Sequence, residues 1–102
     1  MDRLEGKVAL ISGGTGGQGT TEVKLFCSEG AKVIFGDIDD EKGKALETEV
    51  RNAGGEATYV HLDVTSESDW QKAVSKSVEI YGQLDILINN AGVILMKGLE
   101  DT

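Results

Sequence analysis

The chain has 102 residues, of which 39% are hydrophobic and 27% charged, a length and balance that predict one compact folded domain over residues 1–102. Ten Lys and Arg against 18 Asp and Glu give a net charge of −8, which disfavours nucleic acid and anionic membrane surfaces as partners. No apolar run exceeds four residues and a single cysteine excludes an internal disulfide, so we expect no transmembrane segment and a cytoplasmic location.

Short apolar stretches alternate with longer polar ones along the chain. The apolar stretches, rich in Val and Ile, predict strands buried on both faces of a parallel sheet at residues 7–12, 32–37, 57–62 and 84–89. The stretches between them have apolar residues at helical spacing and predict helices at residues 20–29, 40–53 and 67–81. The order β-α-β-α-β-α-β predicts an α/β fold in which each helix connects two parallel strands.

Each predicted helix has one apolar face. In the second helix this face contains Gly43, Leu46, Val50 and Ala53. In the third it contains Trp70, Ala73, Val74, Val78 and Tyr81. Ser66 and Asp69 form a capping-box pattern at the start of the third helix.

A glycine-rich run at residues 12–19 joins the first strand to the first helix. Gly14, Gly16 and Gly19 match G-x-G-x-x-G, while Gly13, Gly17 and Gly19 match G-x-x-x-G-x-G, and the spacing alone leaves both open. Such a loop lets backbone N–H groups approach a phosphate at the positive end of a helix. The phosphate loop of NTPases fits poorly, because Thr20 stands where its lysine belongs.

An acidic residue ends the second predicted strand. Asp37 lies 18 residues beyond Gly19, close to the spacing of about 20 expected between a dinucleotide-binding loop and its ribose-binding acid. A carboxylate there accepts hydrogen bonds from a ribose diol and repels a 2′-phosphate, which favours NAD over NADP. The alternative is a flexible glycine connection followed by a solvated acid.

Three motifs in this order resemble the short-chain dehydrogenase/reductase superfamily, in its ordinary branch. They are Ser12 to Gly19 for T-G-x-x-x-G-x-G, Asp63-Val64 after the third strand, and Asn89-Asn90-Ala91-Gly92 after the fourth. The resemblance covers essentially the whole chain and corresponds to the first, cofactor-binding half of that family. It implies a Rossmann-like, doubly wound parallel sheet, truncated to four strands in the order 3-2-1-4 with three helices.

The resemblance also implies a role for each matching residue. The pyrophosphate loop would comprise Gly13, Gly17 and Gly19, with Thr15 and Gly16 near the adenosine ribose. Asp37 would hold that ribose and Ile38 would pack on the adenine. Asp63 and the Val64 backbone would read the adenine edge, Asn90, Ala91 and Gly92 would line the far side of the cofactor, and Asn89 would stabilise the sheet. Gln18 departs from the aliphatic residue that the family has under the loop.

The family's catalytic Tyr-x-x-x-Lys pair has no match in this sequence. Asp63 follows Tyr59 by four residues and Asp85 follows Tyr81, so no catalytic residue is assigned. The first hypothesis is an NAD-binding fragment without turnover of its own. Two alternatives remain, an oxidoreductase half completed by another chain, and a structural or interaction module without cofactor.

Other candidate groups have simpler interpretations. His61 is the only histidine and has no second metal ligand nearby, so we expect a structural or solvated role and no metal site. The acidic run 37–41 is typical of a helix N-cap rather than a Mg²⁺ site. Cys27 is expected in the core. Residues 84–89 would form an exposed sheet edge, and we expect a homodimer or larger assembly through that edge and the C-terminal tail.

Overall fold

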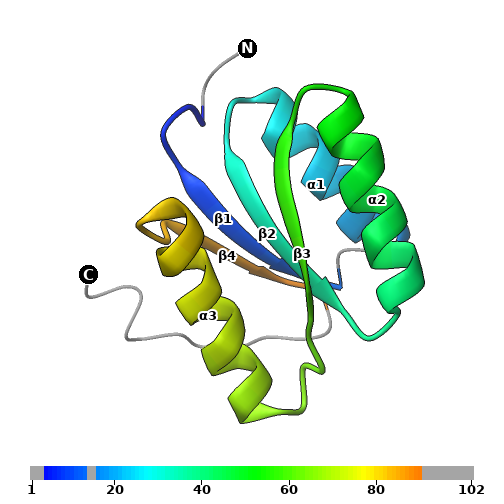
Figure 1. Cartoon of the computed structure of the whole chain (residues 1–102), viewed down its shortest axis with the longest axis vertical. Coiled ribbons are helices and arrows are strands. Elements are labelled where there is room, and N and C mark those ends of the chain that lie inside the picture. Colours follow the sequence, from blue (N-terminus) through cyan, green and yellow to red (C-terminus); the bar gives the residue numbers. More distant parts are fainter. Residues whose placement is uncertain (1–3, 14–15, 91–102) are drawn as a thin grey trace.

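The computed structural model describes residues 4–13 and 16–90, and there the seven predicted elements are present in the predicted order. The elements are β1 (Val8–Ser12), α1 (Gly17–Ser28), β2 (Lys32–Asp37), α2 (Asp40–Asn52), β3 (Glu56–His61), α3 (Glu67–Tyr81) and β4 (Ile86–Asn89) (Figure 1). The four strands form one parallel sheet in the order β3-β2-β1-β4, which confirms the predicted fold class.

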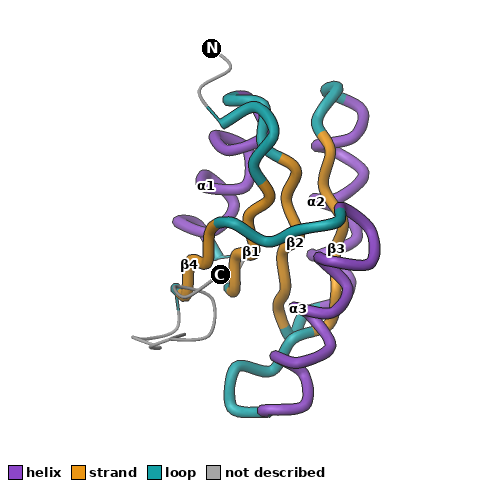
Figure 2. Tube along the Cα trace, turned by 90° about the vertical axis from the view of Figure 1, so that its left-hand side faces the viewer, coloured by secondary structure: helices purple, strands orange, loops and turns teal. Residues whose placement is uncertain are grey.

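The helices cover opposite faces of the sheet, α1 and α2 on one and α3 on the other (Figures 1 and 2). The first face buries Val23 of α1 and Leu46 and Val50 of α2 against the strands. The second buries Trp70 and Ala73 of α3. The apolar spacing predicted these inward positions, with one correction. Ser77 is buried and Val78 is 49% exposed, whereas Val78 was expected on the inward face. Burial of Ser77 is possible because its hydroxyl donates to the Ala73 carbonyl at 2.9 Å.

Two element boundaries differ from the prediction by more than one residue. Helix α1 begins at Gly17 rather than at residue 20, because the Gly16 carbonyl already accepts from the Thr20 N–H at 2.8 Å. Strand β4 begins at Ile86 rather than at residue 84. The Asp85 carboxylate accepts from the Val8 N–H at 2.9 Å, so a side chain takes the place of a strand carbonyl there. Strands β1 and β3 and helix α2 differ from the prediction by a single residue at their ends.

Side chains of α2 cover the free edge of β3. The Glu47 carboxylate accepts from the Tyr59 N–H at 2.8 Å, and Arg51 Nε donates to the Ala57 carbonyl at 2.9 Å. Within the described residues β3 pairs only with β2, so these two contacts replace hydrogen bonds that a further strand would make. No helix in the described part of the chain is long and apolar enough to cross a membrane.

Candidate functional site

The carboxyl ends of all four strands meet at one edge of the sheet, and most of the predicted site residues lie along this edge. Ser12 of β1 pairs with Gly36 of β2 and with Asn89 of β4. The next residues along these strands therefore form a row of Asn90, Gly13 and Asp37. The strand order reverses at β1, and in open α/β sheets ligands bind in the crevice at such a reversal.

Hydrogen bonds hold the ends of β1 and β4 together. The buried Ser12 hydroxyl donates to Asn89 Oδ1 at 2.6 Å and accepts from the Asn90 N–H at 3.2 Å. The Asn90 side-chain amide donates to the Ser12 carbonyl at 2.9 Å and to the Glu22 carboxylate of α1 at 2.7 Å. The serine that replaces the threonine of the T-G-x-x-x-G-x-G pattern keeps the hydroxyl, and this network ties the carboxyl end of β1 to β4 and to α1.

The described residues of the glycine run begin and close a tight turn, in which the Gly16 N–H donates to the Gly13 carbonyl at 3.2 Å. Gly13 has a φ of +67°, and a Cβ there would lie 3.2 Å from the Asn90 Cβ, so the position requires glycine. Gly16 precedes α1 without any side-chain cap, and the first turn of the helix contains no acidic residue. Gly17 and Gln18 are exposed and Gly19 is buried, while Thr15 lies outside the described residues.

The turn between β2 and α2 presents an acid and an apolar side chain side by side. The Asp37 carboxylate accepts from the Ile38 N–H at 2.7 Å, and the Ile38 side chain is 66% exposed. Asp39 caps α2 by accepting from the Lys42 N–H at 3.1 Å, which confirms the N-cap interpretation of this acidic run.

The loop after β3 is ordered by two aspartates. Asp63 accepts from the N–H and the hydroxyl of Thr65 at 2.9 and 2.6 Å, and these bonds lower the pKa of its carboxyl. The Asp69 carboxylate accepts from the Asp63 N–H at 2.9 Å, so it does not return to Ser66 and the capping box is only half formed. The Val64 carbonyl accepts from the Trp70 indole at 2.9 Å. Ala91 and Gly92 lie outside the described residues.

Beside Asp37 lies a polar cluster that the sequence did not predict. Asp40 Oδ1 is 2.7 Å from the Tyr59 hydroxyl and 2.8 Å from His61 Nδ1, and the Tyr59 hydroxyl is also 2.7 Å from the Asp37 carbonyl. His61 pairs with Asp37 across β2 and β3. Side chains alternate along β3, which places Tyr59 and His61 on one face. No pattern in the sequence indicates that Asp40 of α2 is their partner.

Both tyrosines are structural. Burial first, and then the hydrogen bond and charge of Asp40, raise the pKa of the Tyr59 hydroxyl. Burial also raises the pKa of Tyr81, whose hydroxyl bonds Thr58 at 3.0 Å. A raised pKa makes each hydroxyl a weaker proton donor, and both hydroxyls are occupied by contacts within the scaffold.

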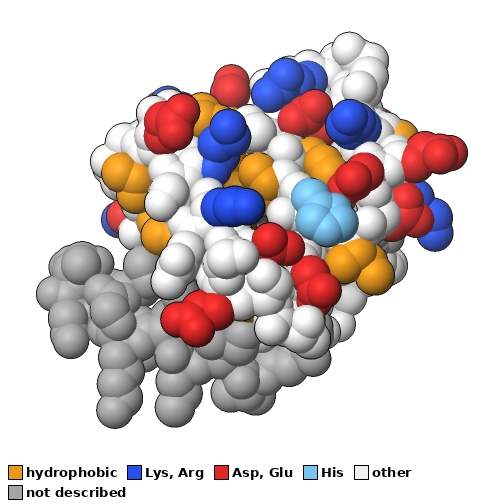
Figure 3. Space-filling view, turned by 60° about the horizontal axis from the view of Figure 1, so that its bottom comes forward, with side chains coloured by type: hydrophobic (Ala, Val, Ile, Leu, Met, Phe, Trp, Pro, Cys, Tyr) orange, Lys and Arg blue, Asp and Glu red, His pale blue; other side chains and the backbone are white. Residues whose placement is uncertain are grey.

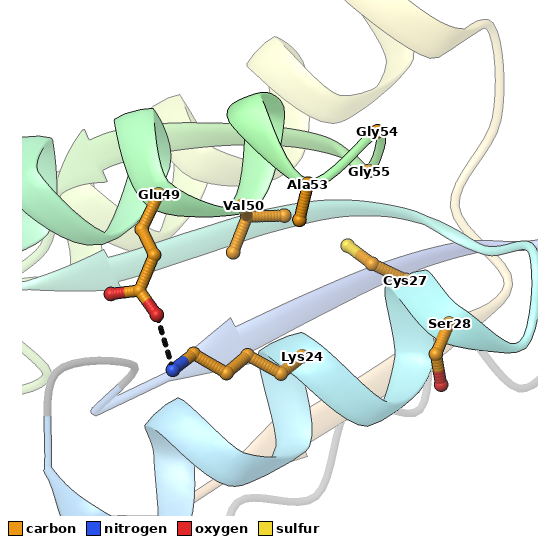
Figure 4. A pocket seen from close by; sticks show the side chains of 8 residues that line it. All are labelled: Lys24, Cys27, Ser28, Glu49, Val50, Ala53, Gly54 and Gly55. Atoms are coloured by element: carbon orange, nitrogen blue, oxygen red, sulfur yellow. Dashed lines mark ion pairs between the residues drawn. The ribbon is translucent and has the colours of Figure 1, made fainter.

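A separate hollow lies at the opposite end of the molecule, between the last turns of α1 and α2 (Figure 4). It has a volume of about 280 Å³, and the Lys24–Glu49 ion pair of 2.5 Å closes one side. Cys27 is half-buried at its wall rather than fully in the core, and burial raises the pKa of this thiol to about 11. No group of three His, Cys, Asp or Glu among the described residues is arranged to hold a metal ion.

Comparison with known proteins agrees with this geometry. The short chain dehydrogenase family matches residues 7–102. The chain is 50% identical over 99 residues to a 3-alpha-(or 20-beta)-hydroxysteroid dehydrogenase of Mycobacterium tuberculosis, covering 97% of this chain and 37% of that protein. It is 46% identical over 100 residues to a 2,5-dichloro-2,5-cyclohexadiene-1,4-diol dehydrogenase of Sphingobium indicum, covering 98% of this chain and 40% of that protein.

Solved structures give the same result. A hydroxysteroid dehydrogenase from Escherichia coli superposes with a TM-score of 0.85 at 34% identity, over 89% of this chain and 39% of that one. A 7 alpha-hydroxysteroid dehydrogenase complexed with NADH superposes with a TM-score of 0.80 at 32% identity, over 83% of this chain and 33% of that one. The chain thus spans about two fifths of the length of its relatives. With the predicted strand order and the glycine turn in place, these matches show that the chain belongs to the short chain dehydrogenase family of oxidoreductases, whose members bind nicotinamide dinucleotides.

Proposed function

We propose that the chain binds the adenosine and pyrophosphate part of a nicotinamide dinucleotide along the carboxyl edge of its sheet, and prefers NAD to NADP. The observation that carries the proposal is the row of Asn90, Gly13 and Asp37, which follows from the pairing of Ser12 with Gly36 and Asn89. The missing side chain of Gly13 leaves room for the Asn90 side chain beside it, and Asp37 would provide the ribose acceptor at the neighbouring strand end.

The glycine turn suits a pyrophosphate in its electrostatics. The first N–H groups of α1 have no intrahelical acceptor, and the start of a helix attracts negative charge. No acidic side chain in the first turn opposes an anion, and Gly17 has nothing within 4 Å of the position that a Cβ would take. The exposed Ile38 and the turn at Asp63 would then flank the adenine.

The preference for NAD follows from charge. A 2′-phosphate would lie next to the Asp37 carboxylate, and no Lys or Arg occurs between residues 8 and 23 to neutralise it.

When bound, the nicotinamide ring accepts or donates a hydride. We propose that the described residues bind and orient the cofactor, and that the proton donor comes from outside them, since Tyr59 and Tyr81 are both engaged in the scaffold.

Titration calorimetry with NADH and NADPH tests the proposal. We expect dissociation constants in the range of about 1 µM to 1 mM for NADH, or roughly −8 to −4 kcal/mol, and weaker binding of NADPH. Asp37→Asn should narrow the difference between the cofactors, whereas Glu41→Gln, which removes the same charge from an exposed position in α2, should preserve it. Equal binding of both cofactors by the unmodified chain would refute the role of Asp37, and a folded chain that binds neither would favour an interaction module instead.

We also propose self-association through β4. Among the described residues β4 pairs only with β1, and its four residues remain half-exposed, whereas Glu47 and Arg51 protect the other edge. A second copy or another chain paired along β4 would extend the sheet at this edge. Light scattering after size exclusion should show a dimer or larger species at low micromolar concentration, and a stable monomer would contradict this part of the proposal. Oxidoreductase turnover that appears only when another chain is added would favour the alternative of an oxidoreductase half completed by that chain.

A further inference from the structure

The strand register places the chain's only histidine beside the acid that is proposed to bind the ribose. His61 is the Cα partner of Asp37 across β3 and β2, so both side chains lie on one face of the sheet at neighbouring strand ends. Its ring is fixed there, because His61 Nδ1 lies 2.8 Å from Asp40 Oδ1. Asp40 is fixed in turn by the Tyr59 hydroxyl at 2.7 Å, so the ring does not sample the surface freely.

The same contacts hold the turn that contains Asp37. The Asp37 carbonyl accepts from the Leu62 N–H at 3.0 Å, and it shares the single proton of the Tyr59 hydroxyl, 2.7 Å away, with the Asp40 carboxylate. Asp40, at the far end of the turn, is bound by Tyr59 and His61. The backbone of Asp37 and the imidazole of His61 are therefore linked through Tyr59 and Asp40, and the Asp37 carboxylate accepts from the Ile38 N–H in the same turn at 2.7 Å.

We propose that His61 is a specificity-determining residue of the cofactor site, whose positive charge reduces the rejection of a ribose 2′-phosphate by Asp37. This inference rests on the dinucleotide site proposed above. A 2′-phosphate carries a charge of about −1.5 to −2 at neutral pH, whereas the diol of NAD carries none, so a charge at this position acts on NADP and hardly on NAD.

The surroundings of His61 keep its charged form available. The hydrogen bond that the imidazole donates to the Asp40 carboxylate raises the pKa of His61 above its usual 6.5, and the charges of Asp40, Asp69 and Asp63 act in the same direction. The ring is exposed, and Figure 3 shows the imidazole at the surface among acidic and basic side chains. The charged groups around it are Asp40 on α2, with Lys44 of the same helix acting on Asp40, Asp63 after β3, and Asp69, Lys72, Lys76 and Glu79 on α3, while Asp37 is its Cα partner on β2.

The sign of the pH dependence follows. The imidazolium is present at and below the raised pKa and is lost as the pH rises through it. Acidification from pH 8 to pH 5.5 should therefore lower the ratio of the NADP to the NAD dissociation constant. For unit charges separated by one to two strand spacings near water, the contribution of His61 should be about twofold to fivefold.

Calorimetry of both cofactors across this pH range, with the unmodified chain and His61→Gln, tests the inference. The 2′-phosphate also titrates near pH 6, and His61→Gln shows the pH dependence that this titration causes without the imidazole, so the difference between the two proteins measures the coupling between His61 and the phosphate. Lys76→Gln is the matched control, because it removes a nearby positive charge and leaves His61 in place. We expect Lys76→Gln to retain the change in the ratio of dissociation constants between pH 8 and pH 5.5. In His61→Gln this change should be smaller by a factor of about two to five. An identical pH dependence in the unmodified chain and His61→Gln would overturn the inference.

A second measurement needs no variant. The chain contains one histidine, so its imidazole gives a single set of proton resonances whose shift follows the pKa of His61. Because binding linkage is reciprocal, NADP should raise this pKa by about 0.3 to 0.7 of a pH unit, and NAD by clearly less. Equal shifts with the two cofactors would also refute the inference. If neither cofactor binds at any pH while circular dichroism shows a folded chain, the proposed function itself fails, and the inference with it.

Discussion

Replacing Gly43 by alanine tests how the scaffold holds the proposed ribose-binding turn. Gly43 lies inside α2, where its missing side chain leaves space for the Tyr59 ring. A Cβ at this position would lie 2.1 Å from Tyr59 Cε1 and 2.3 Å from Cδ1, far inside van der Waals contact. The ring cannot move away easily, because it packs on Phe35 with centroids 5.5 Å apart and its hydroxyl bonds the Asp37 carbonyl.

Two opposing free-energy changes decide the result. Alanine in a helix interior is favoured over glycine by about 1 kcal/mol. Overpacking a filled interior typically costs about 1–3 kcal/mol, and a clash of this depth with a fixed ring lies at the upper end of that range. We expect Gly43→Ala to lower the free energy of unfolding by about 2 kcal/mol, or roughly 8–16 °C in Tm for a domain of this size.

Urea unfolding followed by the fluorescence of Trp70, the only tryptophan, measures this change. Tyr59→Val removes the ring. If the clash is the cause, adding Gly43→Ala to the Tyr59→Val variant should leave its free energy of unfolding unchanged or raise it by up to about 1 kcal/mol. Stability equal to that of the unmodified chain in the single variant would refute the reasoning. An undiminished loss in the double variant would show that the ring is not the obstacle.

Three further predictions concern other parts of the molecule. Gly17→Ala should keep the stability of the chain, since nothing lies within 4 Å of the added Cβ, but calorimetry should show weaker NADH binding because that Cβ points into the proposed phosphate site. Cys27, with a thiol pKa of about 11, should react with iodoacetamide at pH 7.5 on the order of 100-fold more slowly than a free cysteine of pKa about 8.5, as measured by intact mass. Arg51→Ala should increase aggregation measured by light scattering, because it uncovers the Ala57 carbonyl on the edge of β3, whereas the exposed Lys44→Ala should not.

Most of the fold could be predicted because local and long-range signals agree. Strands rich in Val and Ile alternate with amphipathic helices, which leaves few arrangements other than a parallel sheet with crossover helices. Glycine itself caused the error at the start of α1. Its low helix propensity suggested a loop up to residue 19, but the helix is completed by the bond from Thr20 to Gly16.

The candidate site was predictable only where one segment carries the whole signal. The glycine run, Asp37 and the Asn89-Asn90 pair each lie at the carboxyl end of a strand, so the register alone brings them to one edge. The Asp40 cluster joins α2 to β3 across 19 and 21 residues of chain, and no local pattern links those positions.

Gly43 also shows how far helical spacing can predict the role of a residue. Helical spacing placed it correctly on the inward face of α2, yet the spacing cannot say whether an inward glycine is merely small or makes room for a specific partner. The answer depends on the Tyr59 ring, which reaches past the helix backbone to bond the turn at Asp37. A glycine in a helix sacrifices about 1 kcal/mol relative to alanine, and here that loss allows a tyrosine to fix the acid on which cofactor choice is proposed to depend. Gly43 and Tyr59 therefore depend on each other. A substitution of either residue alone should lower both the stability of the chain and its affinity for NAD.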